Sequence, residues 1–371
     1  MRSQERSVED LGGVAGSAEW VRRVLAGGWG ERWAGEPVRP FSAGGAVPLS
    51  HTAGLWRVGE GTGSHVLKVQ LNPEAARAPR FYPLKERIAA HCRSRGVPLP
   101  APVPAVDGAP GVWRGGLVCE LVPLLEGAAA GEFTPGQARA VVRTGLDLRT
   151  ALDGLPSGVR DELATVHLPR LVDEEHWPSA LRDAVDRLLP LAESGEDAWH
   201  RTAAEALREV AAAGRLLAEH PVPATGEPCD RPAVVHSDLH HHHFLFAPAG
   251  PGREEPTVEG VLDLDNLHVG DRLLDLAWLA EAAGRVAGPA ERARSVGDFR
   301  RVAERRGLLC PGEERLLMPL LLAHSLPVIV DIAKDILERD ILSPVWPGYF
   351  ALLSPLRRLE IHRLLTAPPP A

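Results

Sequence analysis

The stretch VVHSDLHHHHFLF, Val234 to Phe246, decides the fold of this chain and raises the question of its chemistry. Two short apolar runs, typical of strands, enclose a polar loop that holds Asp238 and four consecutive histidines. Side chains that follow one another in an extended segment point to opposite faces, so four adjacent histidines cannot all reach one ion. The stretch is therefore interpreted as a loop built around Asp238 and not as a dedicated zinc site.

Two further segments carry residue types that chemistry on a phosphate group requires. Phosphoryl transfer needs a group that orients the attacking hydroxyl, ligands for a metal ion that bridges the phosphates, and a cation on the α- and β-phosphates. Asp238 can serve the first need, and Asp263, 25 residues later in VLDLD, can serve the second. Upstream, the strand-like run HVLKV places Lys68, and the following helix offers Glu86 as its partner. This order of residues is that of the protein-kinase-like fold.

Three separated motifs resemble those of the aminoglycoside phosphotransferases and choline kinases. VVHSDLHHHHFLF resembles their HGDLHPGNVLF loop, and GVLDLDNLHVGDRLLDLAWL resembles their GVIDFGDAGVGDPAYDLA segment. KERIAAHCRSRGVPLPAPV is similar to their glutamate-bearing helix and the proline-containing connector after it. The resemblance covers residues 38 to 285 in the same order, and three motifs together are much more specific than one.

The resemblance implies a role for each matching residue. Asp238 would be the catalytic base that orients the acceptor hydroxyl, and Asp263 would bind magnesium. Lys68 would hold the phosphates of ATP and pair with Glu86. The remaining nucleotide contacts would come from backbone groups beside the adenine, at Glu120 and Val122, and from a segment covering the phosphates, at Gly44 and Gly45.

The chain departs from the family pattern at His243, because the family usually has a magnesium-binding asparagine five residues after the aspartate. A neutral imidazole nitrogen can ligate a divalent ion, but magnesium prefers oxygen. His243 is therefore either a metal ligand beside Asp263 or a sign that the metal is held differently. The family pattern gives His240 a role in shaping the loop and makes Asp271 and Asp275 structural braces.

Composition argues against a nucleic-acid-binding or membrane protein. The chain has 371 residues with 44% hydrophobic and 24% charged residues, and its net charge of −8 does not suit a nucleic-acid partner. The N-terminal residues lack the apolar segment of a signal peptide. The run Leu316 to Val330 is too short for a good membrane span and contains two prolines, so we expect a buried pair of helices there.

Cysteine usage indicates the compartment, and lysine usage is unusual. Four scattered cysteines without a CxxC pair suggest neither a zinc ribbon nor a disulfide framework, and a reducing cytoplasm is the simplest location. Almost all basic residues are arginine, and lysine occurs only at Lys68, Lys85 and Lys334. A lysine that persists against this bias can mark a place that requires a compact ammonium group.

The expected elements divide the chain into two lobes. A hairpin over AGLWRVGEGTGSHVLKVQL, a helix from Pro83 to Gly96 and a buried strand from Gly111 to Val122 belong to the first. Helices follow, beginning with one capped by Thr134.

We therefore predict an α+β, bilobal, protein-kinase-like fold. A small β-rich, nucleotide-binding N-terminal lobe would span residues 1–122, with a helical extension at 1–36. A larger helical lobe, which holds the catalytic and substrate-binding groups, would span 123–371.

The sequence predicts a cytoplasmic O-phosphotransferase that uses ATP and Mg²⁺ and phosphorylates a hydroxyl of a small natural product. Carboxylates at helical spacing in DIAKDILERD could line a pocket for a cationic acceptor, although a solvated helix face explains them as well. Two alternatives remain open. One is a kinase of serine or threonine in a ribosomally made precursor peptide that works with a lyase, and the other, suggested by His243, is a nucleotide-binding pseudokinase. Neither nucleic acid nor membrane is an expected partner, and the oligomeric state is not predicted.

Overall fold

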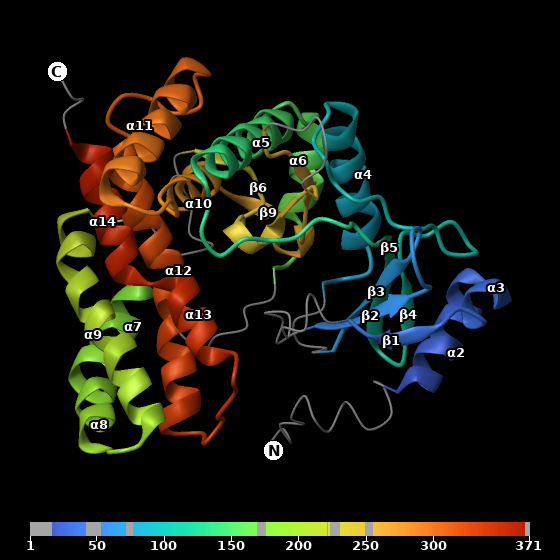
Figure 1. Ribbon diagram of the computed structural model, residues 1–371, viewed down its shortest axis with the longest axis horizontal. Coiled ribbons are helices and arrows are strands. Elements are labelled where there is room, and N and C mark those ends of the chain that lie inside the picture. Colours follow the sequence, from blue (N-terminus) through green and yellow to red (C-terminus); the bar gives the residue numbers. More distant parts are fainter. Residues whose placement is uncertain are drawn as a thin grey trace.

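The structure consists of a β-rich lobe and a larger helical lobe, as Figure 1 shows. It is a computed structural model that describes residues 17–41, 53–71, 77–168, 176–220, 222, 231–248 and 255–367. The expected α+β class with a small β-rich lobe first and a helical lobe second is confirmed. The strand β5 ends at Pro123 and helix α5 begins at Pro135. The exact division after residue 122 stays a prediction.

The N-terminal lobe is a five-stranded antiparallel sheet in the order β1-β2-β3-β5-β4. The expected hairpin is confirmed, and its strand β3 places Lys68 opposite Leu55 on one side and Glu120 on the other. Leu67 and Leu121 of the sheet are fully buried in its apolar core. The strands are β1 Val38–Pro40, β2 Ala53–Val58, β3 His65–Gln70, β4 Val112–Arg114 and β5 Leu117–Pro123.

Among its described residues, this lobe has the helices α2 Ala18–Trp29, α3 Glu31–Ala34 and α4 Phe81–Ser94. The first two form the described part of the expected helical extension, and α2 begins where the Ser17 side chain accepts a hydrogen bond from a backbone N–H. Helix α4 is the expected helix and lies between the sheet and the second lobe (Figure 1). Gly44 and Gly45, expected to cover the phosphates, lie outside the described residues.

The segment from Gly111 to Val122 is a hairpin and not the single buried strand that its apolar run predicts. Gly115 and Gly116 both have positive φ, 60° and 82°, which is the backbone of a two-residue hairpin turn. Glycine adopts this conformation without steric cost, so the pair turns the chain back on itself. The glycine pair was the signal for this turn.

The second lobe is mostly helical. Helix α5 begins with the expected threonine cap, because Thr134 and Gln137 exchange side chain to backbone hydrogen bonds in a capping box. The helices are α5 Pro135–Asp153, α6 Ser157–Ala164, α7 Trp177–Asp183, the π-helical turn η1 Ala184–Leu188, α8 Leu189–Ser194, α9 Ala198–Glu219, α10 Leu273–Ala283, α11 Pro289–Arg305, α12 Glu314–Leu337, α13 Trp346–Leu353 and α14 Pro355–Thr366.

Helix α12 replaces the expected pair of helices, but it is buried as expected. The run Leu316 to Val330 is part of one continuous helix that contains Pro319 and Pro327, not a pair of helices. Both prolines remove a helical hydrogen bond, and the burial of the apolar side chains around them on several sides of the helix offsets this loss. Among the described residues it alone is long and apolar enough to cross a membrane, and 78% of its apolar window is buried inside the protein.

In the described part of the helical lobe, four short strands carry the candidate site. The expected strands β6 Pro232–Val235 and β7 Phe244–Phe246 flank the histidine loop. They pair antiparallel with β9 His268–Asp271 and β8 Val258–Val261, respectively. Two single turns of 3₁₀-helix, η2 His241–His243 and η3 Leu264–Asn266, complete this region. The two pairings therefore bring the histidine loop and the VLDLD segment together.

Asp275 of α10 anchors this region to the helical lobe. Its carboxylate accepts hydrogen bonds from the backbone N–H groups of His236 and Ser237, at 3.1 and 2.9 Å, and forms an ion pair with Arg149 of α5 at 2.9 Å. The side chains of Asp275 and Arg149 are both 1% exposed. Asp271 forms an ion pair with Arg231 at 2.7 Å. The structure therefore supports the interpretation of Asp271 and Asp275 as braces.

Removing the anchor should destabilise the protein strongly. Asp275→Ala leaves the Arg149 guanidinium buried without its main partner, and breaking a buried pair in this way costs about 3–5 kcal/mol. We expect a loss of this size in the free energy of unfolding, measured by urea titration. Asp153→Ala is the matched control because Asp153 is the other partner of Arg149 but is 36% exposed. A similar loss for both variants would contradict the special role of Asp275.

Candidate active site

The loop after β6 presents Asp238 through a strained turn. Ser237 has a φ of 65°, which is unfavourable for a residue with a side chain. Three hydrogen bonds hold it there: its N–H donates to Asp275, its carbonyl accepts from the Trp278 indole at 2.7 Å, and its hydroxyl donates to the Asn266 carbonyl at 3.1 Å. These bonds offset the backbone strain and fix the next residue, Asp238.

The Asp238 carboxylate is oriented and accessible. Asn266 donates a hydrogen bond to its Oδ2 at 3.2 Å, and the side chain is 32% exposed. The second oxygen, Oδ1, lies 3.9 Å from Nε2 of His240. An acceptor hydroxyl can therefore reach Oδ1 while Asn266 holds Oδ2. Sequence analysis missed Asn266, although it directly follows the VLDLD segment.

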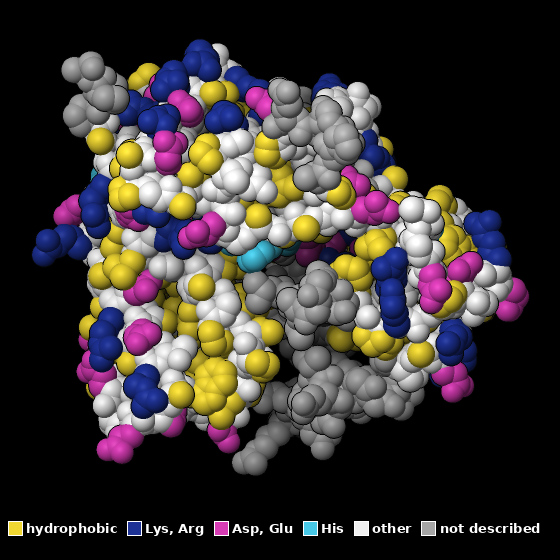
Figure 2. All heavy atoms as spheres, viewed as in Figure 1, with side chains coloured by type: hydrophobic (Ala, Val, Ile, Leu, Met, Phe, Trp, Pro, Cys, Tyr) yellow, Lys and Arg dark blue, Asp and Glu magenta, His cyan; other side chains and the backbone are white. Residues whose placement is uncertain are grey.

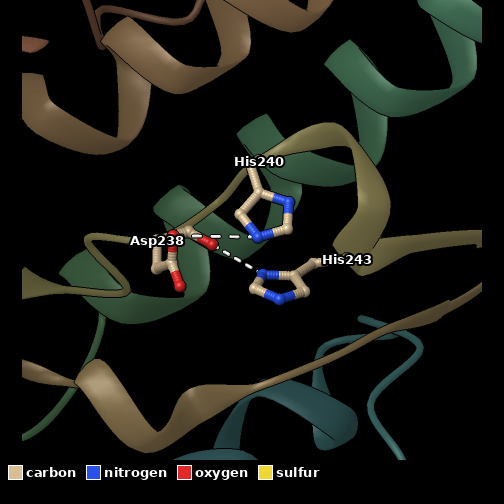
Figure 3. A group of neighbouring side chains, drawn as sticks. All are labelled: Asp238, His240 and His243. Carbon is tan, nitrogen blue, oxygen red and sulfur yellow. Dashed lines mark hydrogen bonds and ion pairs between the residues drawn. The ribbon is translucent and has the colours of Figure 1, made fainter. Parts of the chain in front are cut away.

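His243 connects the catalytic loop to Asp263. Its Nδ1 lies 2.6 Å from the backbone carbonyl of Asp238, an interaction drawn in Figure 3. A carbonyl oxygen can only accept, so Nδ1 carries a proton, and in the neutral imidazole Nε2 is then the nitrogen with the lone pair. Nε2 lies 4.0 Å from Oδ2 of Asp263. The imidazole therefore presents a ligand nitrogen toward the carboxylate that is expected to bind the metal.

His240 braces His243 and is a poor partner for it on a metal ion. Asp238, His240 and His243 do bring ligand atoms within 4.8 Å of one another. However, the two imidazole rings are stacked, with centroids 3.7 Å apart and planes 31° apart. A ring nitrogen directs its lone pair within the ring plane, so stacked rings cannot both point at one nearby ion. The geometry agrees with the expectation that His240 shapes the loop.

Lys68 of the β-rich lobe lies between two carboxylates of the helical lobe. Its Nζ is 2.8 Å from Oδ1 of Asp263 and 2.8 Å from Oδ2 of Asp265. Asp263 itself has a φ of 62°, a left-handed conformation that ends the run after β8 and turns the following residues toward Lys68. The structure therefore brings together Lys68, Asp263, His243 and Asp238, as the sequence predicts.

The expected ion pair between Lys68 and Glu86 does not form. Glu86 pairs with Arg93 one to two turns further along α4. The residue before it, Lys85, points to the site instead, where its Nζ lies 2.6 Å from Oδ1 of Asp265 and 2.7 Å from Oε1 of Glu120. Adjacent helix positions point about 100° apart, so only one of the two residues can face the sheet.

The charges of this cluster shift one another's pKa. Burial alone would lower the pKa of Lys68, but Asp263 and Asp265 outweigh it and hold this pKa well above its ordinary value. Burial alone would raise the pKa of both aspartates, and the lysines, led by Lys68, hold the two values below normal. For Glu120 burial prevails over Lys85 and raises the pKa. Lys68 and both aspartates are therefore charged at neutral pH.

Glu120 and Val122 lie on β5, beside Lys68 and Val66 of β3. The Glu120 side chain, 9% exposed, is committed to Lys85, which sequence analysis did not anticipate. The assignment of their backbone groups to the adenine stays a prediction. Figure 2 shows histidine and acidic side chains at the bottom of a hollow between the two lobes.

Two side chains of helices α12 and α13 feel the charge of Asp238. His324 and Tyr349 are both partly exposed and lie close enough to be influenced by its charge. Burial lowers the pKa of His324 to about 4 although Asp238 opposes this, so the ring is neutral at pH 7. Burial and then Asp238 raise the pKa of Tyr349. These two side chains are candidates for contact with the acceptor, and sequence analysis missed both.

Comparison with known proteins adds independent findings. The phosphotransferase enzyme family matches residues 48–309. Curated protein sequences give no match.

Solved structures similar to this one are small-molecule kinases. Spectinomycin phosphotransferase APH(9)-Ia with ADP and spectinomycin has a TM-score of 0.61 and 13% identity, over 92% of this chain and 98% of that one. A microcompartment-associated aminopropanol kinase has a TM-score of 0.54 and 17% identity, over 94% and 98%. The amicoumacin kinase hAmiN with AMP-PNP and Ca²⁺ has a TM-score of 0.52 and 15% identity, over 92% of each.

These likenesses confirm the kinase-like fold. The family match covers more than half of the 371 residues and includes Lys68, Asp238 and Asp263. The chain therefore belongs to the phosphotransferase enzyme family.

Proposed function

We propose that this phosphotransferase moves the γ-phosphate of ATP to a hydroxyl group of a small natural product, with Asp238 as the catalytic base. The observation that carries the proposal is the position of His243, which hydrogen-bonds the backbone of Asp238 and faces the carboxylate of Asp263. One imidazole thus spans the hydroxyl-binding and the metal-binding parts of the site. The chain is an ATP-dependent phosphotransferase with an alcohol as acceptor.

The residues of the chain contribute mainly position and charge. Asn266 holds one oxygen of Asp238, so the other is free to accept the hydrogen bond of the acceptor hydroxyl and orient it toward the γ-phosphate. Lys68 offers its ammonium group to the phosphates when ATP enters. Phosphoryl transfer asks for little covalent participation by the protein, and a preorganised site supplies much of the rate.

The donor atoms fit a divalent ion. Asp263, with His243 as a second ligand, would hold Mg²⁺, which would offset the negative charge of the phosphates. The 4.0 Å between Nε2 and Oδ2 is longer by about 1 Å than neighbouring ligands on an octahedral ion, so a small inward movement would be needed. A carboxylate with one imidazole also suits Mn²⁺, because nitrogen ligands favour softer ions than magnesium.

Residues of helix α12 in the helical lobe bear on the chemical class of the acceptor. On α12 the partly exposed positions after His324 are Val328, Asp331, Asp335 and Leu337, and the first three continue one stripe from His324 by helical spacing. Arg339 contacts both carboxylates, at 3.0 and 2.8 Å. A cationic acceptor would therefore have to compete with Arg339 for these groups. Spectinomycin, the ligand of one similar structure, supports a small-molecule acceptor, whereas a precursor peptide finds no support in the comparisons.

Asp238 provides the direct test of the activity. Wild-type protein should turn over ATP with Mg²⁺ and one class from a panel of aminoglycosides, macrolides, nucleoside antibiotics, amino alcohols and Ser/Thr peptides. Asp238→Ala should lower that turnover by about 10²–10⁴-fold, because general base catalysis typically contributes that much. ATP affinity should persist in the variant.

Asp298→Ala serves as the control, because this aspartate lies on α11 in an ion pair with Arg301, remote from Asp238. The rate of ATP turnover by Asp298→Ala with the same acceptor should equal that of the wild type. Nucleotide binding without transfer to any acceptor would instead favour the pseudokinase alternative. Undiminished turnover in Asp238→Ala would contradict the proposed base.

His243 provides the test of the metal site. If Nε2 ligates the ion, His243→Asn should retain activity and shift the preference from Mn²⁺ toward Mg²⁺, because it replaces nitrogen by oxygen. His243→Ala should raise the metal concentration needed for half-maximal rate by about tenfold or more, as loss of a supporting group typically does. Titration of Mg²⁺ and Mn²⁺ at saturating ATP measures both effects. Identical metal dependence in all three proteins would exclude His243 as a ligand.

A further inference from the structure

A second lysine is built into the nucleotide site, and the family resemblance assigns no role to it. Lys85 of α4 contacts Asp265 at 2.6 Å and Glu120 at 2.7 Å, while Lys68 contacts the other oxygen of the same Asp265 at 2.8 Å. The side chains of Lys85 and Glu120 are 12% and 9% exposed. Asp265 is thus enclosed by two ammonium groups, one from a strand and one from a helix.

Helix α4 contributes a cation to this cluster and not the expected carboxylate. Sequence analysis expected a glutamate of this helix to orient Lys68, but Glu86 faces Arg93, and the helix presents a cation in its place. A carboxylate that orients Lys68 must then come from elsewhere. Asp265 supplies it from the helical lobe, and Lys85 is the cation that holds Asp265.

The backbone around Asp265 is fixed as well. Arg77, 3% exposed, donates hydrogen bonds to the carbonyls of Asp265 and Leu267 at 2.9 and 3.1 Å. Its guanidinium lies 3.9 Å from the ring centroid of Phe81, at the start of α4. The position of the Asp265 carboxylate is therefore set from both its main chain and its side chain.

Nucleotide binding changes the demands on this cluster. The ammonium of Lys68 would turn toward the phosphates of bound ATP, and Asp263 would then hold the metal ion in place of Lys68. Asp265 then has to share Lys68 with the phosphates. If Lys85 were absent, Asp265 would be neutralised by Lys68 alone and would hold it more tightly, because a buried carboxylate needs a paired cation.

We propose that Lys85 is a positioning residue for ATP, which acts by holding Asp265 so that Asp265 orients Lys68 toward the phosphates. Lys85 also contacts Glu120 on β5, so the same cluster joins α4, the sheet and the loop of the helical lobe. This inference rests on the proposed function, because it deepens the account of the same nucleotide site.

Calorimetric titration with ATP and Mg²⁺ tests the proposal without needing an acceptor. Lys85→Met should raise the Kd for ATP roughly 10- to 100-fold, the range expected for loss of a charged hydrogen bond. Lys85→Arg, which keeps the charge, should restore most of the affinity. Asp265→Asn should also weaken ATP binding, because Lys68 then loses the carboxylate that orients it.

A double variant separates an indirect role from a direct one. If Lys85 acts through Lys68, then Lys85→Met should add little to the loss already present in Lys68→Met. If the fold-increases in the Kd for ATP of the two single variants multiply in the double variant, Lys85 acts independently of Lys68. That result would overturn the proposal.

Lys334→Met is the matched control, since Lys334 is another buried lysine in an ion pair, at 2.9 Å from Asp183. It should lower the melting temperature without changing the Kd for ATP. Lys85→Met with a melting temperature near that of Lys334→Met and an unchanged Kd would refute the role of Lys85. If wild-type protein bound no ATP at all, the proposed function itself would fail, which is a distinguishable result.

Discussion

The contact of Lys68 with Asp263 and Asp265 is the interaction on which the organisation of the site depends. The lysine comes from the sheet of the first lobe and both aspartates from one loop of the second. Charged groups that are largely withdrawn from water require partners, so this contact fixes how the two lobes meet. It also places a cation where the phosphates of a nucleotide would need one.

The catalytic loop depends on a second set of constraints within the helical lobe. Ser237 and Asp263 both adopt positive φ angles, 65° and 62°, on either side of the site. Such conformations persist where surrounding bonds over-determine them. Asp275 and Trp278 of α10 hold the first, and Lys68 holds the side chain of the second. Helix α10 and Lys68 of β3 thus position the loop residue before Asp238 and the side chain of Asp263.

Sequence analysis proposed Asp238, Asp263 and Lys68, and the structure brings them together. They could be proposed because a strand lysine, an aspartate loop and a second aspartate in that order are rare together. The partner of Lys68 could not be found, because Lys85 and Glu86 are neighbours and only the register of α4 decides which faces inward. Asn266, His324 and Tyr349 were missed because their roles arise from proximity to Asp238 in space. The hairpin at Gly115 was missed because the apolar run around it outweighed the glycine signal.

The measurement that tests the account most directly is a crystal structure with AMP-PNP and Mg²⁺. The account predicts that Lys68 leaves Asp263 for the phosphates while keeping its contact with Asp265, that the metal binds Asp263 and His243, and that the γ-phosphate faces Asp238. A structure in which the nucleotide binds outside the hollow between the lobes, or in which Lys68 stays on Asp263, would contradict it.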